Sequence, residues 1–253
     1  MKILNKKIAR KKSSAAWLKR QAGDPYVARA AADGYRARAA YKLIEINEKF
    51  DFLRNGQVVV DLGAAPGSWS QYIARAFPKS KIFAMDLLDI KPIPGVEFYQ
   101  GDFTADEALR WLCQKLSERR AQVSPLHGRS KSADVDDNEP PALCAQRSSL
   151  CREAASADVV LSDMAPNTVG HKRTDHLRQM VLLEYALDFA LRALKPGGTF
   201  VAKSFTGGET GELIREMKMH FAAVHQIKPP SSRKESVEMF IVAQGFKESI
   251  NEE

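Results

Sequence analysis

Short, continuously apolar runs alternate with helix-like segments from residue 57 onward, and this alternation limits the possible folds more than any other feature of the chain. Runs of this length without an every-second-residue pattern are typical of strands that are buried on both faces. Such strands occur in α/β folds, in which helices cover both sides of a mostly parallel sheet. The expected strands are residues 57–62, 81–85, 96–100, 157–162, 199–203, 223–227 and 237–244, and the expected helices are residues 38–50, 68–76, 105–116, 175–194 and 209–221.

The last two expected strands have no helix between them. Residues 223–227 and 237–244 are joined by a short polar segment. Parallel neighbours need a crossover of a dozen or more residues, whereas antiparallel neighbours can be joined by a short loop. We therefore expect a seven-stranded, mostly parallel sheet whose last strand is antiparallel.

The composition fits one folded domain with two polar segments. A hydrophobic fraction of 44% supports a large core and rules out a fully disordered chain. Residues 1–14 are predicted to form a basic disordered arm, and residues 15–253 a single domain. Residues 117–156 are rich in Ser and Arg and lack periodicity, which predicts a flexible surface insertion. No run of 18 apolar residues is present, so we expect no membrane span.

The cysteines indicate the compartment. Cys113, Cys144 and Cys151 form an odd set without a C-x-x-C pair. This pattern argues against a disulfide framework and against a structural zinc site, and it favours a reducing compartment. We therefore expect a cytoplasmic protein.

Positive charge is concentrated at the N-terminus. Residues 1–50 contain 13 Lys or Arg and 4 Asp or Glu, whereas the rest of the chain is close to neutral. A basic arm on a neutral body is the electrostatic pattern of a nucleic-acid-binding protein. An organelle-import presequence, which is also poor in acidic residues, and a solvated tail stay open as alternatives. The residues expected to contact phosphate include Lys11, Lys12, Lys19, Arg20, Arg36 and Arg38.

A glycine-containing turn follows the first expected strand, in the sequence VVVDLGAAPGSWSQY. Gly63 and Gly67 permit a tight turn and a close approach of a ligand to the backbone. The turn does not contain G-x-G-x-x-G, and the chain has no G-K-[ST] sequence, so a dinucleotide fold and a phosphate-binding loop are both disfavoured.

Acidic residues stand at the ends of three successive strands. Asp61 lies at the end of the first strand, where a carboxylate repels a pyrophosphate and attracts a cation. This suits the amino group of S-adenosylmethionine, although Asp61 could also simply cap the turn. Asp86 follows the second strand, where an acid can accept hydrogen bonds from both ribose hydroxyls, and Asp102 follows the third, where it can accept one from an adenine amine.

Asp163 and Lys203 stand at the ends of two further apolar strands. Ligands of open α/β sheets bind beyond the carboxyl ends of the strands, and both residues belong to that edge. Lys203 follows the apolar residues of TFVAK, and a lysine is rarely buried without a function.

Lys42 and Glu238 are expected at the same edge. Lys42 lies near the start of a helix that runs antiparallel to the first strand, and Glu238 opens the antiparallel last strand. A surface lysine and an edge-strand charge that prevents aggregation are the structural alternatives. If the four residues converge, repulsion from a second lysine favours the neutral form of Lys203, which could then act as a base.

Several motifs together resemble the FtsJ-like 2′-O-ribose methyltransferases. The resemblance covers Trp17 to Phe246 apart from the insertion. It departs from the family at that insertion and at Ser68, where a second glycine is usual. The matching motifs are VVDLGAAPGSWSQ, DLLD, GDF, SDMAPN, LKPGGTFVAKSF and KPPSSRKESVEMFIVA.

The resemblance implies a Rossmann-like methyltransferase sheet that binds S-adenosyl-L-methionine and needs no metal. It also implies methylation of a uridine ribose in large-subunit (23S) rRNA, in the peptidyl-transferase A-loop, by a monomer. The rRNA could be free or part of the large ribosomal subunit. A tRNA substrate and a non-catalytic RNA-binding assembly factor remain as alternatives.

The resemblance also assigns residues. The family's Lys-Asp-Lys-Glu tetrad falls on Lys42, Asp163, Lys203 and Glu238, with Lys203 as the proton acceptor. The cofactor residues that it implies are Gly67, Trp69, Asp86, Asp102 and Asp163, and the reasoning above adds Asp61 and Gly63.

Overall fold

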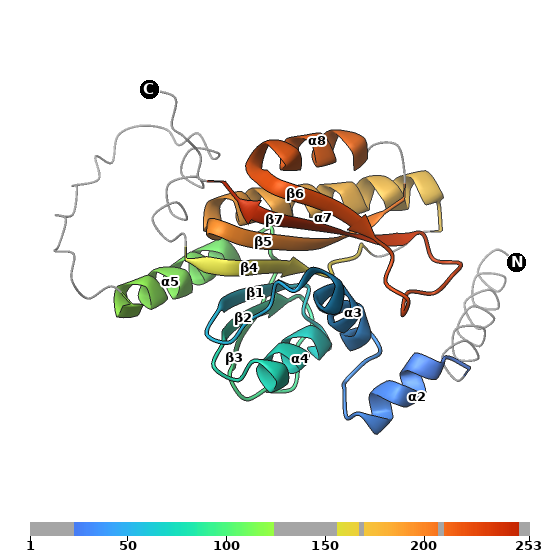
Figure 1. Cartoon of the computed structure of the whole chain (residues 1–253), viewed down its shortest axis with the longest axis horizontal. Helices are drawn as coiled ribbons and strands as arrows, with labels where there is room; N and C mark the ends of the chain where they lie inside the picture. Colours follow the sequence, from blue (N-terminus) through green and yellow to red (C-terminus); the bar gives the residue numbers. More distant parts are fainter. Residues whose placement is uncertain (1–22, 124–155, 167–169, 207–209, 248–253) are drawn as a thin grey trace, which may run out of the picture.

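The computed structural model describes residues 23–123, 156–166, 170–206 and 210–247. Helices and strands alternate along these ranges as the sequence predicts (Figure 1). The helices are α2 (Pro25–Ala32), α3 (Ala40–Phe50), α4 (Ser68–Ala76), α5 (Asp106–Val123), α7 (Lys172–Ala193) and α8 (Thr210–His220). The strands are β1 (Val58–Leu62), β2 (Lys81–Asp86), β3 (Val96–Gln100), β4 (Ala157–Ser162), β5 (Leu194–Phe205), β6 (Phe221–Ile227) and β7 (Glu238–Phe246).

The strands form one seven-stranded sheet in the order β3-β2-β1-β4-β5-β7-β6. Strands β1 to β5 pair in parallel, and β7 pairs antiparallel with both β5 and β6. The expectation of a mostly parallel sheet with an antiparallel last strand is confirmed. The segment between β6 and β7 is too short for a crossover, so β7 returns alongside β6 and inserts between it and β5.

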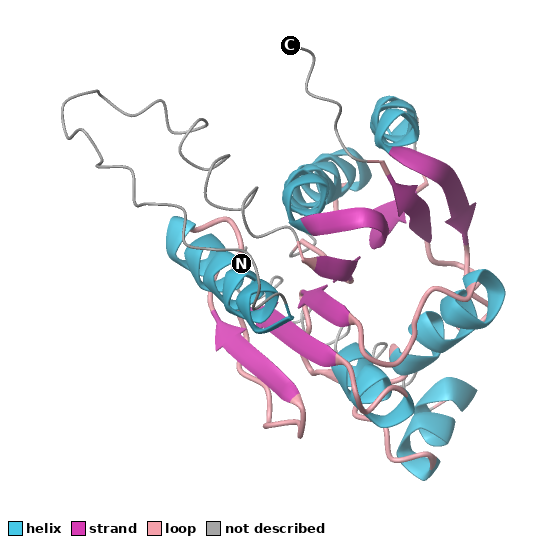
Figure 2. Cartoon of the chain, turned by 60° about the vertical axis from the view of Figure 1, so that its left-hand side comes forward, coloured by secondary structure: helices cyan, strands magenta, loops and turns pink. Residues whose placement is uncertain are grey.

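Helices cover both faces of the sheet (Figure 2), and each face has its own apolar core. Leu43 and Ile46 of α3 and Ile73 of α4 are fully buried against one face. Residues of α5, α7 and α8 pack against the other face. Successive residues of β5 alternate between the two cores, because side chains of a strand point to opposite faces.

Three boundaries differ from the sequence prediction by three residues or more. α5 continues to Val123, so the expected start of the insertion at residue 117 is wrong. Good helix formers extend the helix there, and Glu118 accepts a hydrogen bond from Gln114 one turn earlier. α7 begins at Lys172, where the His171 side chain caps the Thr174 amide. β5 begins at Leu194, with an irregular register before Thr199.

Cys113 is disulfide-bonded, which the expectation of no disulfide framework did not foresee. Cysteine spacing reports on repeated frameworks, and a single pair has no such signature. The basic arm at residues 1–14 and residues 124–155 of the expected insertion lie outside the described residues. Among the residues that are described, no helix has both the length and the apolar character needed to span a membrane.

The order in which the chain adds strands to the sheet reverses between β1 and β4, which are parallel neighbours. From β1 the chain continues to β2 and β3 on one side, whereas β4 and β5 lie on the other side. In open α/β sheets, ligands bind at such a point, beyond the carboxyl ends of the strands. Residues that directly follow Leu62 and Ser162 are therefore placed at the binding edge.

Candidate active site

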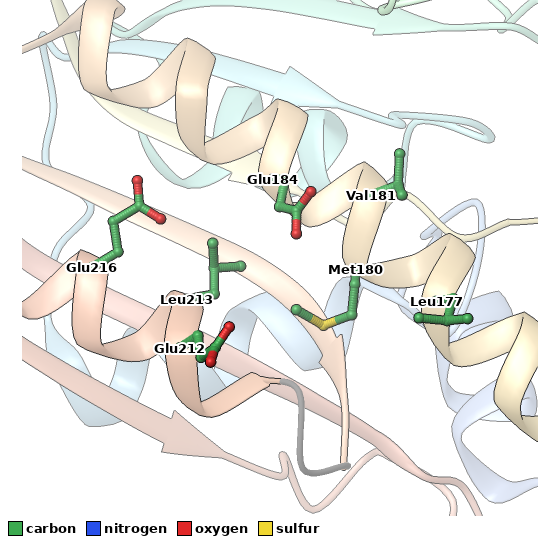
Figure 3. Close-up of a pocket in the computed structure, with 7 residues that line it drawn as sticks. All are labelled: Leu177, Met180, Val181, Glu184, Glu212, Leu213 and Glu216. Atoms are coloured by element: carbon green, nitrogen blue, oxygen red, sulfur yellow. The ribbon is translucent and has the colours of Figure 1, made fainter.

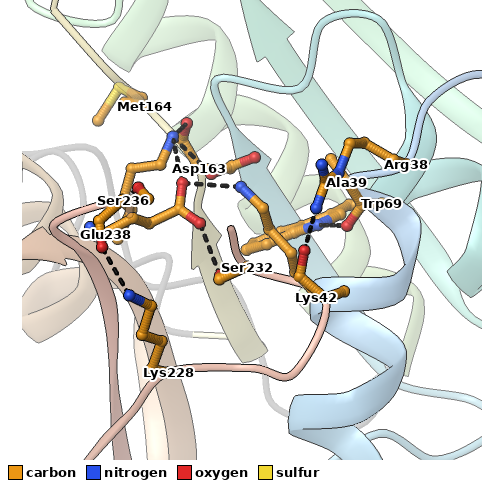
Figure 4. A network of polar contacts seen from close by, with 12 residues as sticks. Arg38, Ala39, Lys42, Trp69, Asp163, Met164, Lys228, Ser232, Ser236 and Glu238 are labelled. Carbon is orange, nitrogen blue, oxygen red and sulfur yellow. Dashed lines mark hydrogen bonds and ion pairs between the residues drawn. The ribbon is translucent and has the colours of Figure 1, made fainter. Parts of the chain in front are cut away.

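The four charged residues predicted to converge do so at the carboxyl edge of the sheet. Figure 4 shows three of them, Lys42, Asp163 and Glu238, close together. Lys203 Nζ lies 2.7 Å from Asp163 Oδ1 and 3.9 Å from Glu238 Oε2. Lys42 Nζ lies 2.7 Å from Glu238 Oε2. Each lysine thus has a carboxylate as its nearest charged partner, and the four side chains are at most 18% exposed.

Strand register explains how Lys203 meets Glu238. Phe205 of β5 pairs with Glu238, and Lys203 pairs with Phe240. Residues two apart on a strand share a face, so Lys203 and Glu238 are diagonal neighbours on one face of the sheet. The same face carries α3, which brings Lys42 into contact with Glu238 from above the strands.

Asp163 is held by its backbone as well as by its charge. Its amide donates to Leu62 O at 3.2 Å, which extends the β1–β4 ladder by one bond, and its carbonyl accepts from Lys203 Nζ at 2.8 Å. Burial raises the pKa of the Asp163 carboxyl, but the charges of Lys203 and Lys42 outweigh it and hold the pKa below its ordinary value. Asp163 is therefore a carboxylate at neutral pH.

Glu238 is oriented by the loop between β6 and β7. Ser232 Oγ donates to Glu238 Oε1 at 2.9 Å, while the other carboxylate oxygen faces Lys42. Ser236 Oγ accepts from the Glu238 amide at 3.2 Å. Lys42 Nζ also lies 5.5 Å from the centre of the Phe240 ring, within the range of a cation–π contact.

Asp61 is a fully buried carboxyl group at the end of β1. Oδ2 accepts a hydrogen bond from Ser70 Oγ at 2.6 Å, whereas Oδ1 has no hydrogen-bond partner among the described residues. Burial is the main cause that raises the Asp61 pKa, to about 7, and the neighbouring Asp163 contributes in the same direction. A buried acceptor without a partner is costly, so this oxygen is suited to receive a donor from a ligand.

The two glycines keep the turn after β1 free of side chains. Gly63 has φ of +76°, and a Cβ there would lie 2.9 Å from the backbone of Met164. Gly67 has φ of +95° and precedes α4 as its N-cap. Both positions demand glycine, Gly63 because the turns after β1 and β4 touch there.

Asp86 and Asp102 stand where the sequence places them. Asp86 accepts from the amides of Ala65 and Leu88 and so fixes the turn that faces it. Asp102 Oδ1 accepts from the amide and hydroxyl of Thr104. Carboxylate oxygens can accept further hydrogen bonds, so these contacts are compatible with ligand binding.

Trp69 lies in the core at 2% exposure. Its Nε1 donates to Ala39 O at 2.8 Å, and its ring packs on Phe240 at 5.7 Å between centroids. Trp69 thus packs between the start of α3, which carries Lys42, and β7. A contact between Trp69 and the cofactor stays a prediction.

The acceptors around the turn fit S-adenosylmethionine. Asp61, Asp86 and Asp102 lie at or just beyond the carboxyl ends of three adjacent strands, and all three carry carboxyl groups. Such a set matches the amino group, the ribose hydroxyls and the adenine amine of that cofactor, and it repels a phosphate. The partnerless Oδ1 of Asp61 is the observation that fits a cationic group best.

Sequence reasoning missed Ser70, Ser232 and Gln179. Ser70 and Ser232 lie within the quoted motifs, but a serine carries no signal of its partner. Gln179 is 1% exposed on the face of α7 that also carries Leu183, Ala186 and Ala190. A single amide on an otherwise apolar helix face was the available signal.

Arg36 and Arg38, two of the residues expected to contact phosphate, have partners within the fold. Arg36 donates to Pro66 O at 3.0 Å and to Pro92 O at 2.9 Å, which ties the turn after β1 to the loop after β2. Arg38 is ion-paired with Asp24 and is 15% exposed. Both guanidinium groups therefore hold loops together.

A groove of about 360 Å³ lies between α7 and α8 (Figure 3) and contains none of the predicted site residues. Met180 and Leu213 form its floor, and glutamates stand at its sides. It offers no lysine or turn backbone for the chemistry described above. In the part of the chain that the structure describes, no cluster of His, Cys, Asp and Glu could hold a metal ion.

Known proteins match this chain over nearly its whole length. Ribosomal RNA large subunit methyltransferase E of Novosphingobium aromaticivorans is 48% identical over 243 residues, which cover 95% of this chain and 93% of that protein. The protein of the same name from Rickettsia bellii is 42% identical and covers 96% of this chain and 94% of its own length. A solved structure from Plasmodium falciparum, assigned as a ribosomal RNA methyltransferase, has 29% identity and a TM-score of 0.62, with coverage of 84% and 98%.

The family model for FtsJ-like methyltransferases matches residues 35–246, a range that includes the turn after β1 and all four members of the charged cluster. With the matching model and these relatives, the chain belongs to the FtsJ-like methyltransferase family.

Proposed function

We propose that this chain transfers a methyl group to large-subunit ribosomal RNA, and that the acceptor is the 2′-hydroxyl of a uridine ribose in the peptidyl-transferase A-loop. Membership in a methyltransferase family makes S-adenosylmethionine the cofactor. The name shared by the relatives supports large-subunit rRNA as the substrate. A hydroxyl acceptor is supported by the cluster at the carboxyl edge, because a hydroxyl must lose a proton during transfer and a lysine there can accept it.

The cofactor would be held by the turn after β1 and the acids that surround it. When bound, S-adenosylmethionine supplies a methyl group that its sulfonium sulfur makes electrophilic. Asp61 would bind the amino group, Asp86 the ribose hydroxyls and Asp102 the adenine amine, while Gly63 and Gly67 leave the backbone accessible. Asp163 lies within reach of both this pocket and Lys203.

The tetrad orients and deprotonates the acceptor hydroxyl. The neutral amine of Lys203 accepts the hydroxyl proton and becomes an ammonium, Asp163 orients that nitrogen and stabilises the ammonium that forms, and the Lys42–Glu238 pair positions the hydroxyl. Alignment of the reacting groups can account for about 7–11 kcal/mol of the barrier. Help from a general base adds roughly 10²- to 10⁴-fold in rate.

The observation that carries this proposal is the meeting of Lys42, Asp163, Lys203 and Glu238. They come from α3, the end of β4, β5 and the start of β7, and every neighbouring pair of opposite charge lies within 3.9 Å. Such convergence of paired charges at the binding edge is typical of catalytic sites.

Replacement of Lys203 by Ala tests the proposal. We expect methyl transfer from tritiated S-adenosylmethionine to large ribosomal subunits to fall by roughly 10²- to 10⁴-fold. Lys195→Ala is the matched control, because Lys195 lies on the same strand but pairs with Asp158 and is 49% exposed. Undiminished transfer by folded Lys203→Ala protein contradicts the role of Lys203.

Mapping of the methylated nucleotide tests the substrate. We expect one 2′-O-methyluridine in the A-loop of large-subunit rRNA and no transfer to tRNA. Methylation of tRNA instead contradicts the proposed substrate, and absence of S-adenosylmethionine binding in calorimetry contradicts an enzymatic role.

A single domain over residues 15–253, a monomeric state and a cytoplasmic location stay predictions from the sequence.

A further inference from the structure

Gln179 is a buried amide that the proposed chemistry does not use directly. It is 1% exposed and lies on α7, on the face of the sheet opposite to α3 and Lys42. Its Nε2 donates to Lys203 O at 3.0 Å and to Met164 O at 3.2 Å. Both partners are carbonyl acceptors, so the NH₂ end of the amide must face them.

These two carbonyls lie just beyond the last paired residues of β4 and β5. Met164 follows Asp163 after the end of β4, and Lys203 lies within β5, which continues along β7 to Phe205. The β4–β5 ladder pairs residues up to Ser162 and Ala202, so Asp163 and Lys203 are the first residues beyond it. On its other side Asp163 is still tied to β1 by a backbone hydrogen bond to Leu62 O. Beyond the last hydrogen-bonded pair of β4 and β5, the Gln179 amide links the two segments through Met164 O and Lys203 O.

The amide stays buried in spite of an energetic penalty. Its Oε1 is buried and has no hydrogen-bond partner among the described residues. A buried unpartnered polar atom destabilises a fold, and an apolar side chain of the same size would avoid that penalty. The neighbours of Gln179 on the same face of α7, Leu183 and Ala186, are apolar.

We propose that Gln179 is a positioning residue that sets the spacing between the Lys203 and Asp163 backbones, and thereby the geometry of the proton-accepting pair. The proposal rests on the proposed function, because it assigns that pair to proton transfer. Lys203 Nζ lies 2.7 Å from Asp163 Oδ1 and 2.8 Å from Asp163 O, so both contacts depend on how far apart the two strand ends lie.

Gln179→Met tests this role, because Met keeps the length of the side chain and removes both donors. We expect kcat for methyl transfer to rRNA to fall about 10- to 100-fold, as small misplacements of catalytic groups do. The KM for rRNA and the calorimetric Kd for S-adenosylmethionine should stay within about threefold, because the amide bonds only to Met164 O and Lys203 O and to none of the acids proposed to hold the cofactor.

Gln244→Met is the matched control. Gln244 Nε2 donates to Phe50 O at 3.1 Å, which is a bond of the same kind away from the tetrad. We expect this variant to lose a similar amount of thermal stability and to keep its kcat. A kcat for Gln179→Met within twofold of the wild-type value overturns the proposal, whereas inactive wild-type protein overturns the proposed function instead.

Gln179→Glu keeps the proposal testable if the Met variant does not fold. A protonated Glu can donate one hydrogen bond to the carbonyls, and an ionised one can donate none. We expect kcat relative to wild type to rise as the pH is lowered, with the folded fraction followed by circular dichroism. A pH–rate profile parallel to that of the wild type overturns the proposal.

Discussion

Asp61 shows how one buried side chain joins stability to ligand binding. It is fully buried, its pKa is raised to about 7, and one of its oxygens is without a hydrogen-bond partner among the described residues. The ordinary value is 3.8, so the folded protein holds a proton there that the unfolded chain releases above about pH 4. Stability therefore falls as the pH rises from about 4 to 7, and the penalty is complete above 7.

Asp61→Asn removes this dependence because the amide cannot ionise. Between pH 5 and pH 8 we expect the free energy of unfolding of the variant to improve relative to wild type by roughly 3 kcal/mol. Urea unfolding at each pH measures this difference. Since the hydrogen bond from Ser70 lowers the Asp61 pKa, Ser70→Ala should move the midpoint to higher pH. A stability difference that is constant over this pH range contradicts the prediction.

At the scale of elements, two N-terminal helices hold the loop that orients Glu238. Asp24, the N-cap of α2, pairs with Arg38 and with Arg233, at 3.2 Å to the latter. Glu45 of α3 accepts from the amide and hydroxyl of Ser231 at 2.8 and 2.6 Å. These contacts fix the β6–β7 loop beside α3, and Ser232 of that loop donates to Glu238.

Asp24→Asn tests the importance of this charge. The substitution keeps an oxygen that can cap the Tyr26 amide but removes the negative charge between two arginines. Because the carboxylate is 7% exposed, we expect a loss of roughly 2–4 kcal/mol and faster amide hydrogen exchange over residues 229–236.

Asp51→Asn is the control for the loss of an ion pair. Asp51 pairs with Arg54 at 2.7 Å but is 78% exposed, so its loss should change stability by no more than about 0.5 kcal/mol. Equal losses in the two variants, or unchanged exchange in the loop, contradict the role assigned to Asp24.

At the scale of the whole molecule, charge is separated along the chain. The chain has a net charge of +7, and residues 1–14 contain six Lys or Arg and no acid. Arg36 and Arg38 are engaged with other parts of the fold, which leaves the residues before them as the expected contacts for an RNA backbone. Neutralisation of phosphates releases counterions, so binding should weaken steeply with salt.

Removal of residues 1–14 should reduce that salt dependence. Each lost phosphate contact lowers the slope of log K against log salt by about 0.7–0.9, and we expect a reduction of at least about 2. Fluorescence anisotropy with an rRNA fragment measures the slope. Removal of residues 248–253, which include three acids and no base, is the control. A slope that is unchanged by the N-terminal truncation contradicts the role of the arm.

Much of this molecule follows from local sequence. Continuous apolar runs predict strands buried on both faces, and the bounds of α4, β3 and β4 were predicted to the residue. The positions of the tetrad follow from topology, because each member stands next to the end of an element. The end of α5 was predicted too early, because polar helix formers and a polar loop look alike in sequence.

The partners within the site were decided only by the tertiary structure. The sequence predicts two lysines and two carboxylates at one edge. Only the β4–β5 pairing brings Asp163 next to Lys203, and only the packing of α3 against the sheet brings Lys42 to Glu238. The sequence also could not show that Trp69 is buried or that Gln179 bridges the segments that carry Asp163 and Lys203. Periodicity is a property of neighbours along the chain, whereas hydrogen-bond partners depend on packing between segments that lie far apart in it.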